Sequence, residues 1–164
     1  MDNLELRMYF LVPYNISEIQ KGIQAGHAAL DYAFRFGKTK LFIDFIKHHK
    51  TWIILNGGVT RKDHRVTHKA GEMNTAENVL RNLQIPYGSF IEPDLNNALT
   101  TLCFICDERV FDSYKYPDYE MYCRNVSIGN RIDFNVDIYK NWSLMMGGDT
   151  NIVLRDLIKD KRLA

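Results

Sequence analysis

Short apolar runs alternate with longer amphipathic segments along the first two thirds of the chain. Four of the runs are rich in aliphatic and aromatic residues, which is typical of buried strands: 6–12, 51–55, 87–91 and 99–105. Three segments carry apolar residues at helical spacing: 18–36, 40–49 and 74–83, the last capped by Asn74 or Thr75. Because strands alternate with helices, the pattern predicts an α/β fold, a single domain with a mostly parallel four-stranded sheet flanked by helices.

The first predicted helix has clear boundaries and two distinct stripes. Ser17 and Gln20 match a capping box, so the helix is predicted from about Glu18 to Phe36, before Gly37. A stripe of small residues adjoins a bulkier one: Gly22, Gly26, Ala29 and Ala33 beside Ile19, Ile23, Leu30 and Phe34. Small residues let a helix approach a sheet closely, so we expect this helix to pack centrally.

The pattern changes after Asp107. Tyrosines and isolated turns precede Gly147 and Gly148, and a last helix follows, capped by Asp149 or Thr150. We therefore expect an α/β domain over 1–108 and a C-terminal extension over 109–164 that packs on it.

Composition and charge narrow the class of protein. The 164 residues are 46% hydrophobic and 25% charged, which excludes a disordered or fibrous chain. A net charge of +1 argues against a protein that binds long nucleic acid through its overall charge, although a local basic patch can still bind it. Three cysteines without framework spacing suit a reducing compartment, and neither a signal peptide nor a membrane span is recognisable. We expect a cytoplasmic protein with no membrane partner.

The first candidate site is the strand-to-helix junction at 14–27. A capped helix start offers backbone N–H groups to a phosphate or a developing negative charge, and Lys21 lies one turn in. Gln24 and His27 are three residues apart and can face one side. The alternatives are a plain capping box with a surface lysine, and a His27 that belongs to the core.

A second polar segment, 92–101, separates two predicted strands. Loops at strand ends hold the ligands in open α/β sheets. Asp94 can orient a water, Asn96 can bind a ligand, and Thr100 or Thr101 can donate a hydrogen bond. The alternative is a polar turn in which Asp94 and Asn96 bond their own backbone.

A glycine pair and a basic segment follow the second predicted strand. Gly57 and Gly58 precede Arg61, Lys62 and Arg65, a run that can track a phosphate backbone or can be a solvated face.

Two pairs of residues have spacings that occur in metal sites, but neither pair indicates one. Cys103 and Cys106 lie three apart in a predicted strand and point to opposite faces. His64 and His68 have the spacing of a zinc-binding helix, but their segment has no apolar periodicity and no Glu accompanies them as in a zinc hydrolase. We expect no metal and no cofactor.

The stretch from Ile19 to Leu30 resembles the type II peptidyl-tRNA hydrolases, whose first helix bears a Lys-x-x-x-Gln-x-x-His-Ala-Ala-Leu-like sequence. The match covers Gln24 and His27 to Leu30, and the order of elements agrees up to about Glu108. Segment 92–101 is similar to the acidic loop that supplies an aspartate and a threonine. The resemblance implies an α/β domain that hydrolyses, without metal, the ester between a peptide and the 3′ ribose of tRNA.

The resemblance also implies site residues. The catalytic set would be Lys21, His27, Asp94 and Thr100. The ligand-binding set would be Gln20, Gln24, Asn96, Thr101, Gly57, Gly58, Arg61, Lys62 and Arg65. The partner would be the tRNA acceptor end.

One departure keeps other functions open. The lysine of the family falls on Gln20, whereas this chain has Lys21, and one residue rotates a helical side chain by about 100°. A redirected or non-catalytic relative that binds or cleaves a small nucleotide is therefore the alternative. The nucleotide could be a signalling nucleotide in phage–host conflict, because the composition is similar to relatives carried by large tailed phages, which act in the host cytoplasm.

A third reading is an interaction module whose tyrosines contact a partner: Tyr114, Tyr116, Tyr119 and Tyr122. A homodimer is a further expectation.

Overall fold

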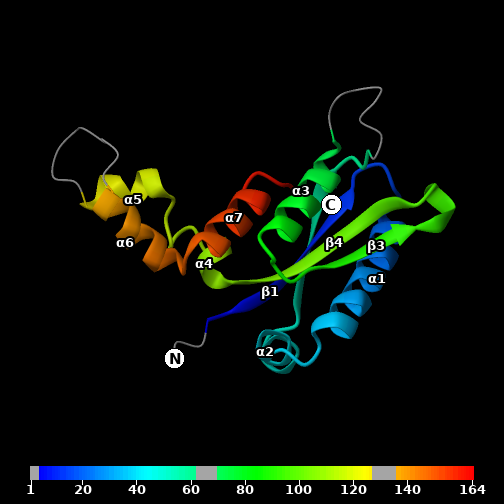
Figure 1. The fold of residues 1–164 in the computed structure, drawn as a ribbon, viewed down its shortest axis with the longest axis horizontal. Helices are drawn as coiled ribbons and strands as arrows, with labels where there is room; N and C mark the ends of the chain where they lie inside the picture. Colours follow the sequence, from blue (N-terminus) through cyan, green and yellow to red (C-terminus); the bar gives the residue numbers. More distant parts are fainter. Residues whose placement is uncertain (1–3, 62–69, 127–135) are drawn as a thin grey trace.

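The computed structural model describes residues 4–61, 70–126 and 136–164 of the chain. Its centre is a four-stranded sheet in the order β2-β1-β4-β3 (Figure 1). The strands are β1 Leu6–Pro13, β2 Thr51–Gly58, β3 Gly88–Glu92 and β4 Ala98–Asp107. The predicted α/β class is correct.

The prediction of a mostly parallel sheet is wrong. β1 is parallel to β2, but β4 lies between β1 and β3 and is antiparallel to both. The reason is the short connection at 93–97, because a parallel return needs a crossover of a dozen or more residues. β1 and β2 have such a crossover, which is formed by α1 (Glu18–Phe36) and α2 (Lys40–His48).

Helices cover both faces of the sheet (Figure 1). One apolar cluster joins the sheet to α1 and α2 through residues such as Phe10, Ala28 and Phe45. A second cluster joins the opposite face to α3 (Glu72–Asn82) and α7 (Asp149–Ile158), through Leu80 and Leu154.

Helix α1 has the predicted boundaries and the predicted capping box. The Ser17 hydroxyl accepts from the Gln20 backbone N–H at 3.3 Å, and Gln20 Oε1 accepts from the Ser17 N–H at 3.0 Å. The buried residues of α1, however, belong to neither of the two stripes seen in the sequence. They are Lys21, Gln24, Ala25, Ala28 and Tyr32.

Helix α1 packs on the sheet as expected, but the small stripe contributes only in part: Ala29 packs, half-buried, against the apolar cluster, whereas Gly22 is exposed. Ala25 and Ala28, which are fully buried, lie on the side of α1 that faces the sheet. Gly88 of β3 lies directly against Ala28. A Cβ atom on Gly88 would lie 2.3 Å from the Ala28 carbonyl oxygen.

Two other predicted boundaries shift. β2 continues through Gly58, beyond the expected break after Leu55. Helix α3 begins at Glu72 with Gly71 at its N-cap, so neither Asn74 nor Thr75 caps it. The Glu72 carboxylate accepts from the Val59 N–H at 3.0 Å, a contact that lowers the pKa of Glu72 and holds the helix start beside the end of β2.

The C-terminal extension contains three helices that the sequence pattern did not predict: α4 Glu108–Phe111, α5 Tyr119–Val126 and α6 Val136–Met146. Helices α5 and α6 lie beyond the end of the sheet, where Tyr119, Tyr139 and Trp142 pack together (Figure 1). These helices bury aromatic residues against each other rather than a regular apolar stripe, which explains why periodicity missed them.

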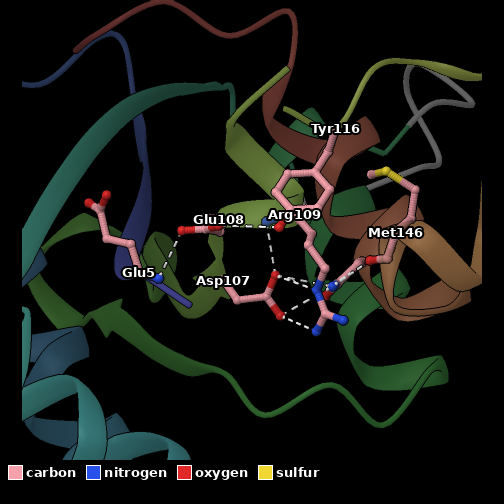
Figure 2. Close-up of polar contacts among 7 residues, drawn as sticks. Glu5, Asp107, Glu108, Arg109, Tyr116 and Met146 are labelled. Atoms are coloured by element: carbon pink, nitrogen blue, oxygen red, sulfur yellow. Dashed lines mark hydrogen bonds and ion pairs between the residues drawn. The ribbon is translucent and has the colours of Figure 1, made fainter. Parts of the chain in front are cut away.

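A polar network at the end of β4 connects the extension to the sheet (Figure 2). The Asp107 carboxylate accepts from the Arg109 guanidinium at 2.6 Å and from the Asn151 amide at 3.3 Å. Glu108 accepts from the Glu5 N–H at 3.2 Å and from the Tyr116 hydroxyl at 3.2 Å. The last residues also continue the sheet, since Ala164 N–H donates to the Ile54 carbonyl at 3.0 Å.

We expect the three cysteine thiols to resist modification in the folded protein. Burial raises the pKa of Cys103 to about 12 and the pKa of Cys106 well above its ordinary value, so little thiolate is present at neutral pH. Cys123 is buried as well. Titration with a thiol-specific chromogenic reagent should detect no fast-reacting thiol before denaturation and three afterwards. Rapid labelling of the native chain would contradict this expectation.

None of the helices in the described ranges combines the length and the apolar composition that crossing a bilayer requires.

Candidate functional site

A cavity of about 360 Å³ opens at the end of the sheet where β1 and β2 finish. Its wall comes from three segments that are distant in sequence. Asn15 follows β1, Thr60 and Arg61 follow β2, and Leu95 and Thr100 come from the β3–β4 connection and β4. Parallel strands deliver their carboxyl ends to one edge of a sheet, which is where α/β proteins bind ligands.

A chain of hydrogen bonds runs from this cavity into the protein. The Thr100 hydroxyl, which is buried, donates to Gln24 Oε1 at 2.8 Å. The same amide donates through Nε2 to Glu92 Oε2 at 2.6 Å. Gln24 is 6% exposed, so both ends of its amide are paired inside the protein. This pairing fixes the side-chain orientation of all three residues.

An irregularity in the sheet allows Thr100 to reach Gln24. Phe90 of β3 pairs with Thr101, but the next residue, Ile91, pairs with Leu99. Thr100 therefore has no backbone pairing partner on β3 and forms a bulge, although its hydroxyl lies 3.3 Å from the Phe90 carbonyl oxygen. Such bulges redirect a side chain and are common beside functional sites.

Lys21 lies on the same buried side of α1 as Gln24, one turn away. Its Nζ atom forms an ion pair with Glu18 Oε1 at 2.8 Å, and its side chain is 10% exposed. Gln20, which matches the lysine position of the family, is exposed and engaged in the capping box. Of these two residues, only Lys21 faces inward beside Gln24.

The structure does not gather the other predicted residues of this region around Gln24. His27 is exposed and stacks on Phe90, with ring centroids 4.3 Å apart. Asp94 is exposed in the turn Pro93–Leu95, and the exposed Asn96 follows it in the left-handed conformation. The Thr101 hydroxyl donates to the Thr100 carbonyl at 2.7 Å.

The glycine pair has a packing role. A Cβ atom on Gly57 would lie 2.2 Å from the Met73 sulfur, and Gly58 has a φ of +92° beside Glu72. Both glycines thus let α3 lie close to the end of β2. Thr60 and Arg61 continue from there into the cavity wall, and the Thr60 hydroxyl donates to the Leu99 carbonyl. Lys62 and Arg65 lie outside the described residues.

Glu92 is the residue that sequence reasoning missed. The acidic and hydroxyl residues of segment 92–101 predict that Asp94 is the carboxylate that acts. Glu92 ends β3 and is half-buried, whereas Asp94 lies two residues further on and is exposed. The position of Glu92 at a strand end next to Pro93 was the available signal.

A larger cavity, of about 490 Å³, lies between the sheet and α7. Two of its cationic residues are already paired, because Arg155 binds Asp118 at 2.8 Å and Arg7 binds Glu5 at 2.7 Å. These pairs hold the C-terminal extension and the start of β1, so we place the candidate site at the smaller cavity.

Comparison with known proteins does not add a relationship to this geometry: no model of a known protein family matches the chain, and no curated protein matches it significantly.

Proposed function

We propose that this chain hydrolyses an ester of the peptidyl-tRNA type, at the cavity beside Thr100. The observation that carries the proposal is the hydrogen-bonded chain Glu92–Gln24–Thr100, which joins a carboxylate to the hydroxyl of a residue that belongs to the cavity wall. The resemblance of residues 19–30 to type II peptidyl-tRNA hydrolases supports the same assignment, because Gln24 lies in the matched segment.

The chemistry needs only water and side chains. The Thr100 hydroxyl donates to Gln24 Oε1 at 2.8 Å and lies 3.3 Å from the Phe90 carbonyl oxygen, so its hydrogen is used inside the protein and its oxygen acts as an acceptor that orients a water in the cavity. The water oxygen forms a bond to the ester carbonyl carbon, and a further water relays its proton to Glu92, which lies behind Gln24 rather than in the cavity wall and whose Oε1 is free of the Gln24 bond. The bond to the ribose 3′ oxygen then breaks, and that oxygen takes the proton back from Glu92 by the same water relay, which restores the carboxylate. Lys21 supplies positive charge on the side of α1 that also carries Gln24.

The cavity wall can bind the acceptor end of tRNA. Arg61 provides a cation at the cavity wall, and Asn15 and Thr60 provide polar groups. A local contact of this kind is compatible with a net charge of +1, because the reacting end of the tRNA needs few phosphate contacts.

A second candidate is binding or cleavage of a small nucleotide. The ion pair between Lys21 and Glu18 favours it, since this pair neutralises the cation that the hydrolase would use. The cavity volume is also within the range of small-molecule sites.

Release of the amino-acid ester from N-acetyl-aminoacyl-tRNA tests the proposal. We expect the wild-type protein to cleave the ester, and to cleave an N-acetyl-aminoacyl trinucleotide ending in CCA more slowly. Unchanged ester after prolonged incubation would contradict the hydrolase assignment. A rise in melting temperature with a mono- or dinucleotide, together with unchanged ester, would support the second candidate.

Replacing Arg61 by alanine should weaken tRNA binding more than chemistry. We expect a higher KM and a nearly unchanged kcat. The slope of log kcat/KM against log salt concentration should become shallower by about one, as for the loss of one phosphate contact. Arg81→Ala is the matched control, because Arg81 is also an exposed arginine but lies at the end of α3 and pairs with Glu77. Equal effects of the two substitutions would contradict a role of Arg61 in binding.

A further inference from the structure

Helix α1 exposes an apolar stripe on the side opposite the sheet. Its four side chains are 77%, 53%, 70% and 91% exposed: Ile19, Ile23, Leu30 and Phe34. They recur at i, i+4, i+11 and i+15, which places them in one line along the helix. The helix packs on β1, β3 and β4 through its other side, and no described element covers this stripe (Figure 1).

The stripe is symmetric about the middle of the helix. Ile19 and Phe34 lie equally far from the midpoint between Gly26 and His27, and so do Ile23 and Leu30. A two-fold axis at that midpoint therefore brings Ile19 of one copy to Phe34 of the other, and Ile23 to Leu30. Self-complementarity of this kind is what an isologous dimer requires.

Two glycines beside the stripe point independently to a close neighbour. Gly22 and Gly26 are inside α1, where glycine is less favourable than alanine. A Cβ atom at either position would meet no atom within 4 Å, so the packing of the described chain does not require them. Small residues at a helix surface allow a second helix backbone to approach closely.

The area of the stripe suits a dimer. At roughly 30 Å² for each methyl or methylene group and roughly 200 Å² for a phenyl ring, the exposed parts of the four side chains amount to about 400 Å² per copy. Two copies contribute about 800 Å², and the flanking residues raise the total towards the roughly 1,000 Å² of a specific interface. Patches of this size on soluble proteins mark contact sites.

We propose that α1 is the interface of a homodimer, in which two copies of α1 pack antiparallel across a two-fold axis between Gly26 and His27. Lys21 and Gln24 lie on the opposite side of the helix, so the dimer leaves the cavity beside Thr100 open. The proposal does not depend on the function of that cavity.

Sedimentation equilibrium of the full chain tests the dimer. We expect Leu30→Asp to raise the dissociation constant at least about 30-fold, because it places a charge in an apolar interface. Leu144→Asp is the matched control, since Leu144 is a 69% exposed leucine on α6, against 70% for Leu30. A wild-type monomer at high concentration, or equal effects of the two substitutions, would overturn the proposal. Binding of the monomer to lipid vesicles through this stripe would overturn it as well.

Gly26→Leu should have opposite effects on the stability of the single chain and on the affinity of the dimer. Open space and better helix propensity should raise the melting temperature of dilute protein, whereas the larger side chain should weaken the dimer. A dimer that Gly26→Leu leaves intact would contradict close approach at the axis.

Cysteine cross-linking tests the antiparallel geometry. A mixture of Ile19→Cys and Phe34→Cys chains should form a disulfide-linked pair on mild oxidation. Ile19→Cys alone should not, because the two copies of position 19 are about 22 Å apart along the helices. The native cysteines are buried and do not interfere. Efficient linkage of Ile19→Cys to itself would indicate a parallel arrangement and overturn the proposal.

Discussion

Replacing Gly88 by alanine is expected to destabilise the protein by roughly 3 kcal/mol. The new Cβ atom would lie 2.3 Å from the Ala28 carbonyl oxygen and 2.8 Å from the Tyr32 backbone nitrogen. Both atoms belong to the backbone of α1, so no side-chain rotation relieves the contact and the helix must move away from β3. For a chain of this length, the melting temperature should fall by roughly 6–12 °C in thermal denaturation.

The matched control is Gly22→Ala in the same experiment, with both variants measured on protein dilute enough to dissociate the dimer proposed at α1. Gly22 is also a glycine at α1, but a Cβ atom there meets nothing within 4 Å. Alanine should raise stability by up to about 1 kcal/mol, since it favours the helix. Tolerance of alanine at Gly88 would show that α1 does not lie against β3 as closely as the structure places it.

Replacing Thr100 by valine is expected to lower kcat/KM for N-acetyl-aminoacyl-tRNA by roughly 10²–10³-fold, with little change in KM. Thr100 belongs to the cavity wall, and valine keeps its shape but removes the hydroxyl that donates to Gln24 at 2.8 Å. Gln24 Oε1 then loses its donor inside the protein, so the amide no longer holds Glu92 in one orientation. Steady-state kinetics of ester release measures the effect.

Thr101→Val provides the control at the neighbouring position. Thr101 is also a buried threonine of β4, but its hydroxyl donates to the Thr100 carbonyl. We expect it to retain activity within a few fold. Thermal denaturation of both variants separates lost chemistry from lost folding. Equal activities of the two variants would contradict the role proposed for Thr100.

Glu92→Gln extends the same argument. The substitution leaves an amide oxygen to accept from Gln24 but removes the carboxylate that takes the proton, so kcat should fall while the fold is kept. Asp94→Asn is the comparison, because the resemblance assigned the carboxylate to Asp94. If Asp94→Asn reduced kcat and Glu92→Gln did not, the assignment would return to Asp94.

Part of the site was accessible from the sequence. Gln24 and Thr100 were both predicted, and the structure brings them into contact although 76 positions separate them. Glu92 and the bulge at Thr100 were not predicted. Strict alternation along a strand cannot reveal a residue that the partner strand leaves unpaired, and the choice between Glu92 and Asp94 depends on where β3 ends.

The sequence alone determined the features that local interactions control. The start of α1 follows from Ser17 and Gln20, which bond each other within one helical turn. The parallel pairing of β1 and β2 follows from the long helical connection between them. These features depend on residues that are close in sequence or on the length of a connection.

Only the tertiary structure decided the features that depend on distant contacts. The insertion of β4 between β1 and β3 made the sheet mostly antiparallel. Helix α1 has apolar residues on two sides, so periodicity could not tell which side faces the sheet. Contact with Gly88 selects Ala28 and Tyr32 for the core, and this choice turns Ile23 and Leu30 outward. Close packing against one surface makes such a decision, and that surface forms only when segments far apart in the chain come together.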